Sequence, residues 1–332
     1  MCSNAPPGLD LASLFHLIKD LGCSDFDYSS TGSEYSSPAI PDTVSSLDPS
    51  GVCHLRSLAL DSPAFFSPSV ASLTLSTLRN SPITNLSLTL TGLSSIQWAT
   101  VLQNVYLPRL SMFKISICCP PHILTPFLAW HGTVEYLWIQ GCLRGALQPF
   151  PPPKLRNFRL PNLKLLAGPP WYLLPILDEI HALGCIQHLR LDMDHHCISF
   201  NRNYLSAILN ITQHFTGIEQ LKVFFFGTRY TVLPANAFDA LIDEHRRAPA
   251  KSLYISIDGC DLFVSSPSCI HSIILTIYQL HCHSWLKAFP DLESVELQSR
   301  FMNVSKELSQ DLEVAFARPD NPFDLRISSI YT

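Results

Sequence analysis

One local pattern recurs along almost the whole chain: an apolar residue, two residues of any kind, an apolar residue, one residue of any kind and another apolar residue. Leu55–Leu60 is the first clear copy, and Leu292–Leu297 is a later one. The copies begin at positions 55, 83, 110, 134, 155, 186, 218, 250, 292 and 322. The end of each copy alternates as a half-buried strand does. The sequence therefore predicts one short strand about every 30 residues, the spacing of a stacked repeat protein.

Helical periodicity lies between the copies. Helices are predicted over Ser95–Tyr106, Trp171–Leu183, Tyr204–Phe215, Ala235–His245 and Val304–Phe316. A strand followed by a helix, repeated many times, implies parallel strands with the helices on one side. One such unit cannot bury its apolar face alone, but a stack can. We therefore expect residues 53–332 to form an α/β solenoid of about ten irregular repeats, with a curved parallel sheet and helices on its convex side.

The copies resemble leucine-rich repeats, whose signature is L-x-x-L-x-L-x-x-N/C-x-L. Cys118 and Cys142 occupy the N/C position of the third and fourth copies. The segments "LRSLAL", "VEYLWIQGC", "KLRNFRL" and "LESVEL", with Pro-rich turns between them, resemble the divergent repeat regions of fungal F-box proteins. That resemblance implies that the repeats recruit a substrate for a ubiquitin ligase, while an N-terminal F-box binds the cullin-ligase adaptor.

Residues 1–52 form a separate N-terminal segment in this interpretation. Leu9–Leu21 predicts one short helix, either a cap over the end of the solenoid, which we favour, or a partner-binding helix. Cys23–Gly51 is rich in Ser, Pro, Asp and Gly and is predicted to be a flexible linker. The first fifty residues hold seven acidic residues and one basic residue. No F-box is recognised here, so the ligase adaptor is expected as a partner only if an F-box lies upstream.

Composition and motifs argue against common enzyme classes. Only 13 glycines occur in 332 residues, and the chain contains no G-x-G-x-x-G, P-loop, G-x-S-x-G or H-E-x-x-H motif. The cluster Asp192–Cys197 could supply metal ligands, but it directly follows a predicted strand, where a turn is the better interpretation. His281 and His283 are too close in sequence to share a helix face. We therefore predict a non-enzymatic protein without catalytic, cofactor or metal sites.

Charge and hydropathy bear on location. A net charge of -5 offers no general attraction for nucleic acid. No apolar leader opens the chain. The uncharged stretch Leu262–Leu286 contains several Ser and His residues, so a buried helix is expected there rather than a membrane span. We expect a cytoplasmic or nuclear protein that contacts neither nucleic acid nor membrane.

The candidate binding surface comes from the fifth residue of each copy. That residue lies between two inward-facing apolar positions, so it should point to the concave surface. From the third to the eighth copy this column is basic or aromatic: Lys114, Trp138, Arg159, Arg190, Lys222 and Tyr254. Neighbouring columns add Tyr136, Arg156, His188 and Phe224.

Six neighbouring strands would make a stripe roughly 24 Å long. Aromatic and Arg side chains are common anchors of protein interfaces. This pattern predicts a surface for a protein partner with an acidic or mixed face. The alternatives are a merely solvated sheet face, a scaffold or degenerate repeat protein without a ligase link, and an enzyme with an unrecognised site.

Overall fold

The computed structural model describes residues 11–28, 54–89, 93–141, 158–180, 183–194, 204–226, 248–258, 288–299 and 324–329. The chain divides into two compact units. The N-terminal unit comprises residues 1–163 together with 179–181, and the C-terminal unit comprises residues 164–178 and 182–332. Within the described ranges, no helix is both long and apolar enough to cross a membrane.

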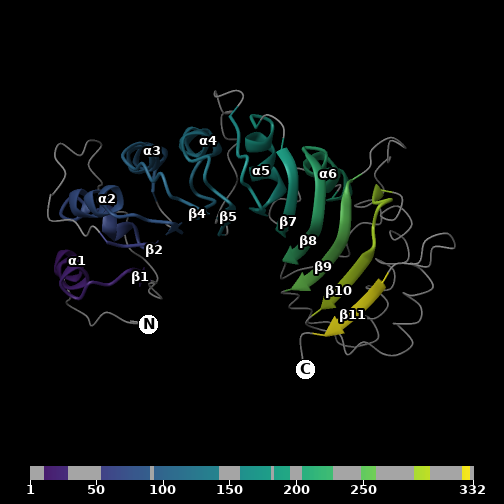
Figure 1. The fold of residues 1–332 in the computed structure, drawn as a ribbon, viewed down its shortest axis with the longest axis horizontal. Coiled ribbons are helices and arrows are strands. Elements are labelled where there is room, and N and C mark those ends of the chain that lie inside the picture. Colours follow the sequence, from purple (N-terminus) through teal and green to yellow (C-terminus); the bar gives the residue numbers. More distant parts are fainter. Residues whose placement is uncertain are drawn as a thin grey trace. The chain divides into compact units, whose positions relative to one another are not determined.

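The N-terminal unit is a parallel sheet with helices along one side (Figure 1). Its strands are adjacent in chain order: β1 (Asp25–Tyr28), β2 (Ser57–Leu60), β3 (Asn85–Leu88), β4 (Met112–Ser116) and β5 (Tyr136–Gln140). Its helices are α1 (Leu11–Asp20), the 3-10 turn η1 (Pro63–Phe66), α2 (Ala71–Asn80), α3 (Ser95–Gln103) and α4 (Pro121–Trp130).

The C-terminal unit repeats this arrangement. Its strands are β6 (Leu165–Gly168), β7 (Leu183–Asp194), β8 (Phe215–Phe226), β9 (Ala250–Asp258), β10 (Ser294–Ser299) and β11 (Asp324–Ser329), again adjacent in chain order and parallel. Its helices are α5 (Pro170–Leu177) and α6 (Tyr204–Thr212). The parallel α/β architecture expected from the sequence is therefore present in both units.

Of the five helices predicted between the copies, three fall on described residues, and all three form but end earlier than predicted. Ser95–Tyr106 contains α3, which ends at Gln103. The other two are α5, which ends at Leu177, and α6, which ends at Thr212; Leu183 and Phe215, predicted as the last residues of these helices, are instead the first residues of two paired strands. The helices predicted over Ala235–His245 and Val304–Phe316, and the one around Leu262–Leu286, lie outside the described residues.

A repeated hydrogen-bond pattern shows which residues are equivalent between copies. The carbonyl of Arg56 accepts from the amides of Thr84 and Asn85 at 2.8 and 3.0 Å. One copy later, the carbonyl of Thr84 accepts from Ser111 and Met112 at 2.9 and 3.0 Å. Each acceptor is the second residue of its copy. Equivalent residues thus repeat both in sequence and in backbone hydrogen bonding.

The inward apolar positions form the core of each unit. Leu137, Leu189 and Leu221, each the central apolar residue of its copy, have exposed fractions of 1%, 0% and 0%. Their burial confirms the prediction made from the pattern. Because alternate residues of a strand point to opposite faces, the residues between the apolar positions lie on the face away from this core.

The fifth copy is not where the sequence pattern placed it. In Leu155–Leu160, Phe158 makes only an isolated bridge with Ile180, and residues 155–157 lie outside the described ranges. The strand is instead β6, where Leu166 is aligned with Leu189. The carbonyl of Lys164 accepts from the amides of Gln187 and His188, both at 3.0 Å, as the second residue of a copy does elsewhere. The fifth copy therefore begins at Leu163.

The predicted linker Cys23–Gly51 begins with a strand, so that prediction was wrong for residues 25–28. Phe26 aligns with Leu58 in the parallel pairing of β1 and β2. The carbonyl of Ser24 accepts from Arg56 and Ser57, so a further copy begins at Cys23. Asp25 and Asp27 stay exposed, while Phe26 packs against the buried Phe65 with ring centroids 6.3 Å apart. Residues 29–53 lie outside the described ranges.

Helix α1 packs against this first copy. Phe15 and Ile18 are buried, and the Phe15 ring lies 5.8 Å from the Phe65 ring in an edge-on arrangement. Leu17 and Leu21 remain exposed. The buried face of α1 covers the aromatic residues of the first copies, in keeping with the cap interpretation.

Candidate functional site

The candidate site is built on the sheet face opposite the buried leucines. In the C-terminal unit we call this surface the C-terminal open face and define it by His188, Arg190, Lys222, Phe224 and Tyr254. The parallel register places Arg190, Lys222 and Tyr254 side by side on three adjacent strands. All five side chains are only partly buried. The predicted column is therefore formed here by direct strand pairing.

Cations of the C-terminal open face lie against aromatic rings. The Cζ atom of Arg190 is 4.0 Å from the centroid of the Phe224 ring, and Nζ of Lys222 is 5.7 Å from that of Tyr254. The Phe224 and Tyr254 rings lie 5.5 Å apart. Cations within about 6 Å of a ring centroid are attracted by the ring quadrupole. The surface is therefore an ordered layer of alternating cationic and aromatic groups.

Polar side chains fix the edges of this layer. Nδ1 of His188 donates to Oε1 of Gln220 at 3.1 Å, and the Tyr254 hydroxyl donates to Oε1 of Gln298. Ser294 donates to Ser252 at 2.9 Å. These bonds join neighbouring strands, so the orientation of the exposed groups is set by the sheet itself.

The sequence predicted a turn at Asp192–Cys197, but Asp192–Asp194 continue strand β7, and Asp192 lies beside Arg190 on this face. Residues 195–197 lie outside the described residues. The Oδ1 atom of Asp192 accepts from Nε of Arg190 at 2.8 Å. Burial raises the pKa of the Asp192 carboxyl above its usual range, although the adjacent Arg190 guanidinium acts in the opposite direction. The period-two alternation of β7 would have placed Asp192 beside Arg190, since both lie on one face of the strand.

A smaller surface of the same kind lies in the N-terminal unit. We call it the N-terminal open face and define it by Lys114, Tyr136 and Trp138. Lys114 and Trp138 are aligned on β4 and β5, with Nζ of Lys114 5.4 Å from the Trp138 ring centroid. The Tyr136 and Trp138 rings are nearly parallel, with centroids 5.9 Å apart. Three of the predicted residues therefore come together here.

Two predicted residues do not join either open face as expected. Arg159 is exposed but lies before β6 and belongs to no strand, because the fifth copy begins at Leu163. Ala167 takes its place beside Arg190 in the strand register. Arg156 lies outside the described residues. The predicted basic or aromatic column is therefore interrupted by an alanine.

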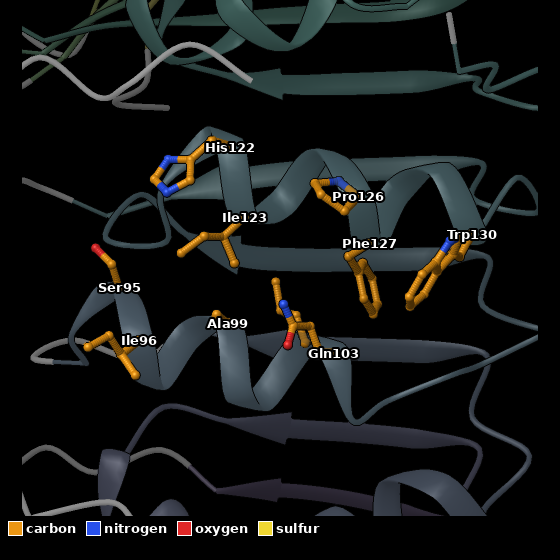
Figure 2. Close-up of a pocket in the computed structure, with 10 residues that line it drawn as sticks. Ser95, Ile96, Ala99, Gln103, His122, Ile123, Pro126, Phe127 and Trp130 are labelled. Atoms are coloured by element: carbon orange, nitrogen blue, oxygen red, sulfur yellow. The ribbon is translucent and has the colours of Figure 1, made fainter. Parts of the chain in front are cut away.

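A groove on the helix side of the N-terminal unit was not predicted. It lies between α3 and α4 and has a volume of about 640 Å³. Figure 2 shows Ile123 and Phe127 of α4 pointing toward α3, on which Ala99 and Gln103 lie, with Ile96 and Trp130 at opposite ends of the groove. Ile96 and Trp130 have exposed fractions of 62% and 58%. Large apolar side chains on the outer side of two helices are the sequence signal that could have predicted this groove.

The comparisons with known proteins give no family for this chain. The sequence matches no protein-family model and no curated protein. Among the residues that the structure describes, no group of three or more His, Cys, Asp or Glu side chains could hold a metal ion. The two open faces and the helix groove are therefore the features from which function is inferred.

Proposed function

We propose that the chain is a non-enzymatic protein-binding module of the leucine-rich-repeat type, and that it binds its partner through the open faces of its sheets. The observation that carries this proposal is the C-terminal open face, where Arg190 and Lys222 are held against Phe224 and Tyr254. Arg and aromatic groups are enriched at the centres of protein interfaces. A partly buried, pre-ordered surface also loses little side-chain entropy on binding.

The charges of the open faces favour a partner with an acidic or mixed surface. The cations lie on Lys114 in one unit and on Arg190 and Lys222 in the other. Complementary charge mainly speeds association, so the on-rate should fall as salt increases. Recruitment of a substrate to a ubiquitin ligase is the specific role that the resemblance to fungal F-box proteins implies. A scaffold without a ligase link is the alternative within the same class.

A comparison of immobilised variants tests the surface. Proteins retained from cell extract by the wild-type chain are compared with those retained by Arg190→Glu and by Trp138→Ala. Arg79→Glu on α2 and Trp130→Ala on α4 are matched controls, because they make the same kinds of change on exposed helix residues. We expect partners to be lost with the open-face variants and kept with both controls.

The controls also locate an alternative site. Loss of partners with Trp130→Ala alone would move binding to the groove between α3 and α4. Retention of every partner by all four variants would contradict a role for the open faces. The ligase role has its own readout, which is whether the cullin-ligase adaptor is among the retained proteins. Circular dichroism of each variant checks that the fold is intact.

A further inference from the structure

Arg190 is held from two directions on the C-terminal open face. Its Nε donates to Asp192 at 2.8 Å, and its guanidinium lies 4.0 Å from the Phe224 ring centroid. The side chain keeps an exposed fraction of 37%. Among the described residues, the terminal nitrogens Nη1 and Nη2 have no hydrogen-bond partner. These two donors have the geometry that pairs side by side with a carboxylate.

Lys222 places a second cation next to this guanidinium. It is aligned with Arg190 on the neighbouring strand, and its Nζ lies over the Tyr254 ring. Parallel strands are about 4.8 Å apart, so the two cations extend from neighbouring backbone positions on the same face. Asp192 is the carboxylate that already pairs with Arg190, and its side chain is only 22% exposed.

We propose that the carboxylate of an acidic partner peptide binds to Nη1 and Nη2 of Arg190, beside Lys222. Asp192 competes with that carboxylate for the positive charge of Arg190. This inference rests on the proposed function and specifies its partner chemistry. In the free chain, Asp192 orients Arg190 and lowers the positive potential of the face. A partner carboxylate must bind next to that negative charge, so weakly acidic surfaces are rejected.

The Asp192→Asn substitution separates the charge of Asp192 from its hydrogen bond. The side-chain amide oxygen that it introduces still accepts from Nε of Arg190, while the repulsive charge is gone. Because burial raises the pKa of Asp192, the charged carboxylate is disfavoured at this position, and the Asp192→Asn variant should fold at least as stably at neutral pH. Asp192→Ser is a second variant without the charge.

The experiment measures fluorescence anisotropy of a fluorescein-labelled oligo-glutamate peptide with the full chain at pH 7.5 and low salt. Removal of one charge a few ångströms from the bound carboxylate should tighten binding of the Asp192→Asn variant about threefold to tenfold. Arg190→Gln should weaken binding about tenfold. In the double variant, the gain from Asp192→Asn should largely disappear, because the guanidinium that holds the partner carboxylate close to position 192 is absent. Asp178→Asn, an exposed carboxylate of the same unit that lies beside His214, is the matched control.

The outcomes distinguish this inference from the proposed function. If no variant differs from the wild type, or none binds, the proposed use of the face fails. If Arg190→Gln weakens binding and Asp192→Asn weakens it too, the face binds peptides but Asp192 only positions Arg190. If Asp178→Asn gives the same gain, net charge rather than competition explains it, and the inference is overturned. Equal binding of an oligo-thymidine probe with the same variant effects would overturn the assignment to an acidic peptide.

Discussion

At the residue scale, His131 shows how one side chain joins two segments of the N-terminal unit. Its Nδ1 donates to the carbonyl of Phe127 at 2.6 Å, and its Nε2 accepts from the amide of Leu107 at 2.9 Å. The imidazole also stacks on the Phe127 ring, with centroids 3.9 Å apart. Both nitrogens are satisfied only in the neutral form, because a protonated Nε2 cannot accept from an amide.

The first prediction is that His131 makes stability dependent on pH. Burial lowers the pKa of His131 in the folded chain, while the Phe127 carbonyl opposes that shift. The unfolded chain therefore binds this proton more readily. The contribution of neutral His131 to the free energy of unfolding is fully present above about pH 6.5, the usual pKa of histidine. It is lost as the pH falls from there through the lower pKa of the folded state.

Urea unfolding at pH 7.5 and pH 5.5 measures this effect. The free energy of unfolding of the wild type should fall between the two values, and His131→Gln should show a smaller fall because position 131 no longer titrates. His16→Gln, at an exposed position of α1, is the control. An equal fall in the wild type and in both variants would show that His131 does not carry the effect.

At the element scale, local signals explain where several helices begin. Ser94 caps α3: its Oγ accepts from the amide of Gln97 at 3.3 Å, and the Gln97 side chain accepts from the Ser94 amide at 2.8 Å. This reciprocal capping box satisfies two amides that the helix itself cannot pair. Proline begins α4 and α5, at Pro121 and Pro170, where a missing amide proton does no harm.

The second prediction concerns the cap of α3. Ser94→Ala removes the side-chain acceptor and should lower the free energy of unfolding by about 1 kcal/mol. The neighbouring Ser95→Ala substitution should change it by less than about 0.5 kcal/mol, as exposed positions usually do. Urea unfolding of both variants gives the comparison. Equal effects would mean that the capping bond contributes nothing specific.

At the scale of the whole molecule, each copy packs mainly on its neighbours in the sheet. The strands of each unit pair in chain order, so each strand is bonded to the copies before and after it. In such a stack, stability is approximately a sum of repeat and nearest-neighbour contributions. Damage to one copy should therefore remain partly local.

The third prediction tests this locality. Leu137→Ala in the N-terminal unit and Leu221→Ala in the C-terminal unit should each lower the free energy of unfolding by about 2–5 kcal/mol, because both side chains are buried. Leu189→Ala should do the same. Hydrogen exchange should show the largest loss of protection in β4 and β5 for Leu137→Ala, and in β7 to β9 for Leu221→Ala. A uniform loss along the chain would contradict a repeat-like core.

The repeat pattern by itself determined much of the fold. Alternation within a strand is a local property, so the sequence correctly predicted the inward position of Leu189 and the outward position of Arg190. The register then aligned Arg190, Lys222 and Tyr254 because equivalent residues of successive copies pair directly.

Only the tertiary structure decided between competing segments. Residues 155–160 fit the apolar pattern fully, whereas 163–168 carry Gly168 at the last apolar position, yet the hydrogen bonds from β7 to Lys164 selected the second segment. Asp25–Tyr28 became a strand because its aromatic residues pack against α1 and Phe65, contacts that composition does not reveal. The groove between α3 and α4 likewise depends on two helices from different copies. These features arise from contacts between residues far apart in sequence, whereas periodicity reports only which face of its own element a residue occupies.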